Sequence, residues 1–298
     1  MADSVTHKST SSVFLNGEIV PATEARLPIT DQGLLYGFGL FETFRTSGGH
    51  PHHWQFNRTR LEAACAKAGL VLPPTFLAVD EARLAKVVQF LLQESRLADA
   101  VFRYTVTAGS ADLPSELMAL RPLPSTSASQ ISLRILNLRR DAGEWIPRPK
   151  SLNYLNAILG TRELRNRNAA ESDEGLFLSR EGEFVVETAR QNLAWISGGR
   201  MHVPDASVGP VAGTCLAWIR TRGLQIEPSR ATLGEFLKAE AIFVLNSVRG
   251  ITPVGEVWNE SDTQLLGAYS SVAHPLIMTA QREWQEALEE TAKGRKWP

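Results

Sequence analysis

The sequence predicts an α+β fold with two domains, and three observations support this. Its 298 residues suit about two domains at roughly 150 residues each. Hairpin signals and helical periodicity occur in both halves of the chain, without the regular strand–helix alternation of a doubly wound sheet. A polar stretch over residues 121–129 carries two prolines, which is typical of a linker. We therefore expect two compact units, each with its own hairpins and helices.

The expected boundaries follow from the same signals. Residues 1–12 are polar and lack the apolar stretch of a secretory signal, so we expect a disordered lead. A smaller N-terminal α+β domain should cover residues 13–125, and a larger C-terminal domain should cover residues 130–298. No apolar run reaches the length of a membrane span. With only two cysteines, Cys65 and Cys215, the chain suits a reducing, cytoplasmic compartment.

The N-terminal domain should begin with a β-hairpin. Asn16 and Gly17 lie between two short apolar pieces, and Asn-Gly is the strongest short hairpin signal. Residues 54–69 and 81–97 place apolar side chains at helical spacing, with a glycine at the end of the first helix as its cap. Residues 100–109 have the pattern of a strand.

The C-terminal domain should open with a half-buried strand over residues 131–135, where apolar and polar residues alternate. The alternation slips by one at Leu136, which indicates a bulge or the end of the strand. The remaining elements are expected in this order: a helix over 153–167, a hairpin over 175–187, a hairpin over 193–203, a helix after Gly213, a strand over 241–245 and a final helix within 265–292.

Charge and composition exclude several classes of protein. Thirty-one basic residues nearly cancel 32 acidic ones, for a formal net charge of −1, whereas a protein that coats nucleic acid carries a basic excess. Hydrophobic residues make up 43% of the chain, which excludes a mostly disordered one. His50, His52 and His53 cluster in an expected turn without carboxylate or cysteine partners. We expect a solvated loop there and no metal site.

Lys150 is the first candidate for chemistry. It lies between the proline-rigid approach Pro147-Arg148-Pro149 and the start of an apolar helix. Partial burial there would favour the neutral amine, which is the nucleophile that Schiff-base chemistry needs. The alternative is an ordinary solvated lysine, which is the commoner case.

Four further segments carry a charge or a backbone suited to an anion. Glu187 ends an apolar strand and would pair with a buried cation. Arg60, on the first long helix, would present a fork to a phosphate. Gly213 opens a helix whose first N–H groups would face an anion, and the polar residues 246–250 follow a strand. Each has a plain alternative: a solvated glutamate, a surface arginine, a helix cap or a turn.

The order and spacing of these segments resemble the class IV aminotransferase family of fold-type IV pyridoxal-phosphate enzymes. This family includes branched-chain and D-amino-acid aminotransferases, R-selective amine transaminases and 4-amino-4-deoxychorismate lyase. The resemblance covers about residues 14 to 254. Three motifs carry it: Phe-Leu-Asn-Gly followed by Asp-Gln-Gly-Leu-Leu-Tyr-Gly-Phe-Gly-Leu-Phe-Glu-Thr-Phe-Arg over 31–45, Lys-Ser-Leu-Asn-Tyr-Leu over 150–155, and Glu187 five residues before Asn192.

The resemblance implies a two-domain, D-amino-acid aminotransferase-like enzyme that uses pyridoxal 5'-phosphate. Lys150 would hold the cofactor aldehyde as a Schiff base and would later shuttle the proton that leaves Cα. Glu187 would keep the pyridine nitrogen protonated, so that the ring accepts electrons. Arg60 would bind the phosphate, and Tyr154 would lie near the ring oxygen. The remaining phosphate ligands would be Gly213, Thr214, Cys215 and Ser247.

The substrate pocket has several candidates. They are Tyr36, Thr43, Arg45, Arg103 and Arg249. The three arginines are candidates for the substrate carboxylate, and the alternative for each is a pair with a nearby acid. By the same resemblance we expect a homodimer in which residues 36–45 face the partner's site.

Three positions depart from the family pattern. Asn57 stands where the family usually has histidine, three residues before the phosphate arginine. Phe38 replaces the aspartate of a common Gly-Asp-Gly, and Gly213-Thr214-Cys215-Leu216 replaces Gly-Ile-Thr-Arg. These departures concern the phosphate ligands and the affinity for the cofactor. They leave Lys150 and Glu187 untouched.

Two activities fit the resemblance. An aminotransferase would move an amino group between an amino acid or amine and a 2-oxo acid through Lys150. A 4-amino-4-deoxychorismate lyase would release pyruvate and 4-aminobenzoate, and the runs 41–45 and 246–251 resemble that branch. A cofactor-free binding module is disfavoured because Lys150 and Glu187 are intact. We expect an aminotransferase, because the family holds more of them and Phe38 departs from the lyase pattern. The partners would be small molecules, without nucleic acid or membrane.

Overall fold

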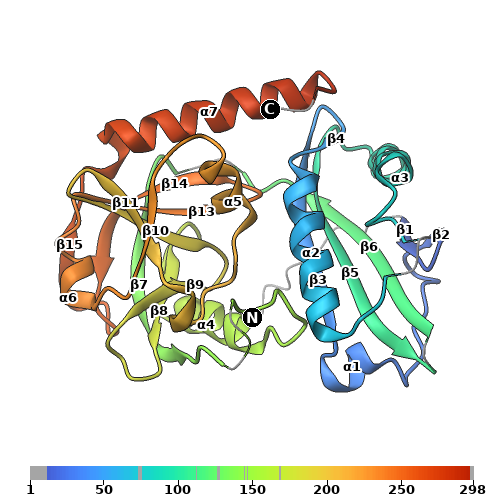
Figure 1. The fold of residues 1–298 in the computed structure, drawn as a ribbon, viewed down its shortest axis with the longest axis horizontal. Helices are drawn as coiled ribbons and strands as arrows, with labels where there is room; N and C mark the ends of the chain where they lie inside the picture. Colours follow the sequence, from blue (N-terminus) through green and yellow to red (C-terminus); the bar gives the residue numbers. More distant parts are fainter. Residues whose placement is uncertain are drawn as a thin grey trace. The chain divides into compact units, whose positions relative to one another are not determined.

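The computed structural model describes residues 12–72, 76–111, 113–125, 128–143, 145, 147–167 and 169–295. All but the last residue of the expected lead, 1–12, therefore lies outside the described part. Contacts divide the chain into two compact units (Figure 1). Unit 1 takes Met1–Ser125, Lys150–Asn153 and Glu286–Pro298, and unit 2 takes Thr126–Pro149 and Tyr154–Gln285. Each unit combines helices with a sheet, which confirms the expected α+β class.

Unit 1 is built on a six-stranded sheet in the order β2-β1-β6-β5-β3-β4, with every neighbouring pair antiparallel. Its strands are β1 (Ser12–Leu15), β2 (Glu18–Pro21), β3 (Gly39–Ser47), β4 (His50–Pro51), β5 (Ala100–Ser110) and β6 (Leu113–Pro122). The predicted hairpin is confirmed, since Asn16 and Gly17 join β1 to β2 with φ angles of 48° and 99°. A two-residue turn between strands requires such positive values.

Three helices belong to unit 1: α1 (Gln32–Tyr36), α2 (Trp54–Ala68) and α3 (Glu81–Glu94). The two longer ones confirm the predicted helices, and α1 was not expected. Helix α2 packs against β3 (Figure 1) and ends at Gly69, whose φ of 69° is the left-handed value of a glycine cap. Its buried residues Trp54, Leu61 and Cys65 join the unit's hydrophobic core.

The histidine cluster lies in the turn region after β3, against the end of the last helix, α7 (Pro275–Ala292). His52 Nδ1 and Thr291 Oγ1 are 2.9 Å apart, and the His52 and His53 rings are 3.9 Å apart. Both side chains are buried, so the expected solvated loop is wrong for them. Burial, the neighbouring His53 and Arg45 together lower the pKa of His52 to about 2. His52 is therefore a neutral packing residue.

Unit 2 is built on a nine-stranded mixed sheet, in the order β12-β11-β10-β13-β14-β7-β8-β9, with β15 added on β14. Its strands are β7 (Ile131–Arg140), β8 (Glu174–Ser179), β9 (Val185–Thr188), β10 (Asn192–Ser197), β11 (Arg200–Pro204), β12 (Ile226–Ser229), β13 (Ala241–Asn246), β14 (Gly250–Trp258) and β15 (Leu265–Ala268). The pairs β7–β8, β7–β14 and β11–β12 are parallel. The β7–β8 register shifts between Ile135 and Arg139, so the slip predicted at Leu136 is confirmed.

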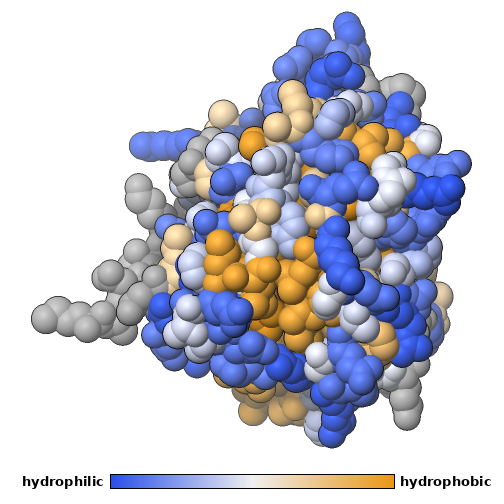
Figure 2. Space-filling model, turned by 90° about the vertical axis from the view of Figure 1, so that its left-hand side faces the viewer, coloured by the Kyte–Doolittle hydropathy of each residue, from blue (hydrophilic) through white to orange (hydrophobic). Residues whose placement is uncertain are grey.

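The helices of unit 2 surround this sheet. They are α4 (Leu155–Asn166), α5 (Thr214–Arg220), α6 (Leu233–Phe236), the first part of α7, and the 3-10 turns η1 (Ala206–Val208) and η2 (Ser271–Ala273). The expected helix within 265–292 begins only at Pro275, because Leu265–Ala268 pair with β14 as a strand. Figure 2 shows a hydrophobic region in the middle of one face of the molecule, bordered by hydrophilic residues. Among the described residues, no helix is both long and apolar enough to cross a membrane.

Candidate active site

Lys150 lies on a short segment that pairs with the edge of β3. The Phe41 N–H donates to the Lys150 carbonyl at 2.9 Å, and the Leu152 N–H donates to the Gly39 carbonyl at 3.0 Å. A Cβ on Gly39 would come within 2.7 Å of the Leu152 side chain, so glycine permits this close approach. Lys150 was expected in the second domain, but these bonds group Lys150–Asn153 with unit 1.

The Lys150 side chain lies over an aromatic ring of β3. Its Nζ is 4.6 Å from the centroid of Phe41. The Arg103 guanidinium carbon is 3.5 Å from the same centroid, and Phe41 itself is 2% exposed. Both distances are within the range of a cation–π contact. One buried ring therefore joins the predicted Schiff-base lysine to a predicted substrate arginine.

The same face of the unit 1 sheet carries other predicted pocket residues. Side chains alternate along a strand, so Thr43 and Arg45 point to the same side of β3 as Phe41. Arg103 on β5 stands directly opposite Thr43 in the antiparallel register and shares that face. Thr43, Arg45 and Arg103 therefore share one face of the sheet, and Arg103 contacts the same Phe41 ring as Lys150. Tyr36, at the end of α1, is exposed.

The opposite face of β3 holds a buried carboxylate to which the sequence alone assigned no role. Glu42 is 1% exposed. Its two oxygens accept hydrogen bonds from Arg60 Nε at 2.8 Å and Arg60 NH2 at 2.5 Å, and Asn57 Nδ2 donates to it at 2.7 Å. A bidentate carboxylate fixes the plane of a guanidinium. The predicted phosphate arginine is therefore held in place by Glu42, with Asn57 at the position where the family usually has histidine.

In unit 2, Glu187 on β9 is a buried carboxylate with several donors. The Val211 N–H donates to its Oε2 at 3.0 Å, and Asn192 Nδ2 donates to the same oxygen at 3.4 Å. Arg140 NH2 lies 3.4 Å from Oε1. The buried cation expected beside Glu187 is thus Arg140, the last residue of β7, which was not among the residues predicted from the sequence.

The surroundings of Glu187 are rich in positive charge and incompletely satisfied. The Arg140 Nε is buried and has no hydrogen-bond partner among the described residues. Burial and the charge of Arg140 lower the pKa of Arg148, whose Nε donates to the Gly209 carbonyl. Buried donors are almost always paired. The orphaned Nε beside a buried carboxylate is therefore an observation that points to a polar ligand.

The predicted phosphate residues of α5 lie close to the Glu187 cluster within unit 2. Gly213 caps α5 without a side-chain hydrogen bond, and a Cβ there would be 1.9 Å from Asn192 Oδ1. Since Asn192 also contacts Glu187, only glycine fits this approach. Thr214 and Cys215 are buried, and burial raises the pKa of the Cys215 thiol. Cys215 therefore remains a neutral thiol.

The other predicted residues of unit 2 occupy turns and a helix start. Tyr154 precedes α4 and donates its hydroxyl to the Ala189 carbonyl at 3.3 Å. Ser247 and Arg249 lie in the turn between β13 and β14, where Asn246 Oδ1 accepts from the Arg249 N–H at 2.8 Å. These contacts fix the backbone of the turn.

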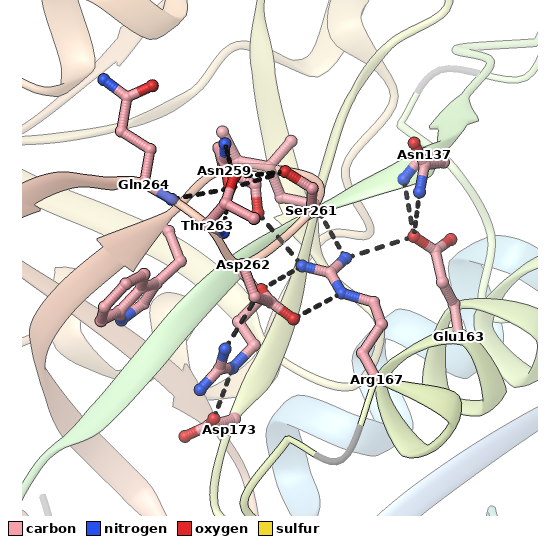
Figure 3. A network of polar contacts seen from close by, with 12 residues as sticks. Asn137, Glu163, Arg167, Asp173, Asn259, Ser261, Asp262, Thr263 and Gln264 are labelled. Carbon is pink, nitrogen blue, oxygen red and sulfur yellow. Dashed lines mark hydrogen bonds and ion pairs between the residues drawn. The ribbon is translucent and has the colours of Figure 1, made fainter.

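A second group of charged side chains in unit 2, most of them part-buried, forms a network of mutual contacts (Figure 3). Arg167 Nε donates to Asp262 Oδ2 at 2.8 Å, and its NH2 also contacts this carboxylate. Arg134 Nε lies 2.6 Å from Asp173, and its NH1 lies 3.1 Å from Asp262. Glu163 adds a further ion pair with Arg167. This network joins β7, α4, the approach to β8 and the turn after β14, so it serves structure.

Comparisons with known proteins agree with this geometry. The family described as amino-transferase class IV matches residues 39–257. The chain belongs to this family, which confirms the resemblance seen in its motifs.

Some similar proteins are named as lyases and others as aminotransferases. Aminodeoxychorismate lyase of Bacillus subtilis is 27% identical over 301 residues, covering 96% of this chain and 98% of the relative. A putative branched-chain-amino-acid aminotransferase of Methanocaldococcus jannaschii is 26% identical over 269 residues, covering 82% and 87%. The crystal structure of 4-amino-4-deoxychorismate lyase from Pseudomonas aeruginosa has a TM-score of 0.73 at 25% identity, covering 92% and 98%. The relatives therefore include both lyases and aminotransferases.

Proposed function

We propose that this protein is a pyridoxal-phosphate-dependent aminotransferase that acts on the amino group of a small amino-carboxylic acid. The observation that carries the proposal is the pair of cations on Phe41: the Lys150 amine and the Arg103 guanidinium. An amino acid presents an amine and a carboxylate one carbon apart. A reactive lysine beside a carboxylate-binding arginine suits such a substrate. Members of the family use pyridoxal phosphate.

The residues present suit this cofactor in two ways. The buried carboxylate of Glu187 would pair with a protonated pyridine nitrogen, and the orphaned Arg140 Nε beside it has a donor to offer. Gly213, where a Cβ would meet Asn192, leaves the backbone bare at the start of α5. The resemblance to the family assigns these cofactor ligands: Lys150, Arg60, Glu187, Tyr154, Gly213, Thr214, Cys215 and Ser247.

When bound, pyridoxal phosphate supplies an aldehyde that condenses with amines and a ring that accepts the electron pair left at Cα. Lys150 Nζ would take the proton from the substrate Cα, because it is a positioned amine close to the reacting carbon. Arg103 would hold the substrate carboxylate with a bidentate fork. The N–H groups of Val211 and Asn192 and the ion pair with Arg140 would favour the charged form of the Glu187 carboxylate.

A lyase that releases pyruvate from aminodeoxychorismate is the second candidate. The names of the Bacillus subtilis and Pseudomonas aeruginosa relatives favour it. Both reactions would begin with the loss of the Cα proton to Lys150. They differ in where the electron pair left at Cα would go. In transamination a proton would be added on the cofactor side, whereas in the lyase reaction the pair would expel a leaving group from the substrate.

We also propose a homodimer. Leu34, Leu35 and Tyr36 of α1 are exposed at 67%, 52% and 72%, and such apolar clusters mark docking sites. In unit 2, Leu155 and Ile158 of α4 are exposed as well. Light scattering that gives a dimer mass supports this proposal, and a fully active monomer contradicts it.

The proposed function is tested by the variant Lys150→Ala. The wild type should take up pyridoxal phosphate covalently, detected as a mass increase on the peptide containing Lys150 after borohydride reduction. The variant should show no such increase, because no other amine holds that position. Attachment of the cofactor to another lysine would contradict the assignment.

The two reactions separate by their products. Purified enzyme is mixed in turn with L- and D-amino acids, R-amines and aminodeoxychorismate. An aminotransferase converts the cofactor to its amine form and releases an oxo acid. A lyase releases pyruvate from aminodeoxychorismate while the cofactor absorbance returns unchanged.

A further inference from the structure

We propose that Phe41 is a positioning residue whose ring holds the Lys150 amine and the Arg103 guanidinium at a fixed spacing. The inference rests on the proposed function, because it concerns how that site receives an amine and a carboxylate together. Phe41 would then position two cations in addition to filling space in the fold. All three residues belong to unit 1.

The geometry places two like charges on one ring. Lys150 Nζ is 4.6 Å and Arg103 Cζ is 3.5 Å from the Phe41 centroid. The two atoms are therefore at most about 8 Å apart, a separation at which like charges still repel. The negative face of an aromatic ring attracts each cation. The ring thus offsets a repulsion that would otherwise drive the two side chains apart.

The ring itself cannot move to follow them. Phe41 is 2% exposed, and its N–H donates to the Lys150 carbonyl at 2.9 Å. The nearest acid on its own strand, Glu42, points to the other face of the sheet, where it binds Arg60 and Asn57. The Phe41 ring is therefore a contact that the two cations share.

An aromatic ring and an aliphatic side chain should then behave differently at position 41. Leucine fills much of the same space but has no quadrupole, so it keeps apolar burial and loses the attraction for cations. Tyrosine keeps the ring face. Phe44 offers a matched control on the same strand, because it is equally buried but contacts Phe102 and Trp54 on the opposite face.

The experiment compares wild type, Phe41→Leu, Phe41→Tyr and Phe44→Leu in two assays. The first measures the rate of covalent uptake of pyridoxal phosphate by Lys150 in cofactor-free protein. The second measures reductive methylation of Lys150 by formaldehyde and borohydride, with Lys67 and Lys86 of unit 1 as internal references. In Phe41→Leu we expect cofactor uptake to slow about tenfold and methylation of Lys150 to rise about tenfold, because the amine leaves its place and enters solvent.

Substrate kinetics give a third readout. Phe41→Leu should raise KM about tenfold for an amino acid and leave KM nearly unchanged for the matching amine without a carboxylate, because only the first uses Arg103. Phe41→Tyr should behave as the wild type in all assays. Phe44→Leu should lower the unfolding midpoint without these changes.

Three results would overturn the proposal. They are equal methylation of Lys150 in wild type and Phe41→Leu, a Phe41→Tyr variant as defective as Phe41→Leu, and the same coupled loss in Phe44→Leu. A wild type that takes up no pyridoxal phosphate would overturn the proposed function instead. Methylation would still decide whether Phe41 holds Lys150.

Discussion

Two groups of charged side chains in unit 2 differ in how fully their polar atoms are paired. In the network of Figure 3, Arg167 donates to Asp262, to the Ile135 carbonyl and to the Asn259 carbonyl. Around Glu187, Arg140 contacts one carboxylate oxygen, but its buried Nε has no hydrogen-bond partner among the described residues. Both groups join the same strand, β7, to neighbouring segments.

In the Figure 3 network the charged groups pair with each other. In the Glu187 cluster a donor remains that could bind a ligand. A buried ion pair gains little net stability unless its remaining hydrogen bonds are made, and the Figure 3 network makes them. A buried donor left unpaired is costly, and a native structure keeps one where a ligand or a reaction uses it. The Glu187 cluster is therefore the one for which we propose a ligand.

The largest expected effect that tests this comparison is the loss of turnover in Glu187→Gln. The variant should keep the cofactor through Lys150 but remove Cα protons about 10²–10³-fold more slowly, the size of losing one placed electrostatic contact. Stopped-flow absorbance measures this step. Normal turnover of this variant would show that Glu187 has a structural role only, like the Figure 3 network.

The next effect is a loss of stability in Asp262→Asn. Asp262 is a part-buried carboxylate shared by Arg167 and Arg134. Hydrogen bonds to charged groups contribute about 1.5–3 kcal/mol each, so the free energy of unfolding should fall by about 3 kcal/mol. Urea denaturation measures the loss. Turnover at a temperature where the variant is folded should equal that of the wild type, and a specific loss of turnover would contradict the structural role.

A smaller effect concerns ligand linkage. Pyridoxal phosphate at about 100 times its Kd should raise the free energy of unfolding by about 2.7 kcal/mol. The rise should be equal in wild type and Asp262→Asn, and smaller in Glu187→Gln. Of these two carboxylates, Glu187 is the one that would contact the cofactor. Thermal melts with and without cofactor provide the comparison.

The smallest effect is the acid sensitivity of the network. Burial alone would raise the pKa of Asp262, but hydrogen bonds from Arg167 and Arg134 outweigh burial and hold this pKa below its ordinary value of 3.8. A carboxyl whose pKa is lower in the folded than in the unfolded protein stabilises the fold at pH values above the unfolded pKa. This stabilisation is lost as the pH falls through the folded pKa. The free energy of unfolding should therefore decrease below about pH 4, by at most about 1.4 kcal/mol for each pH unit. Urea denaturation at a series of pH values measures the slope, and Asp262→Asn should remove the contribution of this carboxyl.

The fold was predictable wherever a short-range pattern decides it. Asn16-Gly17 specifies a hairpin by its turn geometry, and the apolar spacing of α3 and the slipped alternation at Leu136 report burial directly. The residues 265–268 form a strand rather than part of the last helix because β14 offers them an edge. The apolar spacing of these four residues alone does not distinguish a short edge strand from the start of a helix.

The sequence names candidate site residues through the family motifs, but it does not name the residues that contact them. Lys150 and Glu187 stand in recognisable runs. Glu42 and Arg140 had only one local signal each, a charged residue at a buried position of a strand. Their partners come from other elements, α2 and β9, so only the folded chain shows that they act with Arg60 and Glu187.

The end of α7 belongs to unit 1 together with residues far earlier in the chain. Ser47 donates to the Leu288 carbonyl at 2.9 Å, and His52 meets Thr291. A chain leaves the ribosome from its N-terminus and folds as it emerges. The six strands of the unit 1 sheet are all synthesised once the chain has reached Pro122. The contacts of Ser47 and His52 must wait until Leu288 and Thr291 have been added.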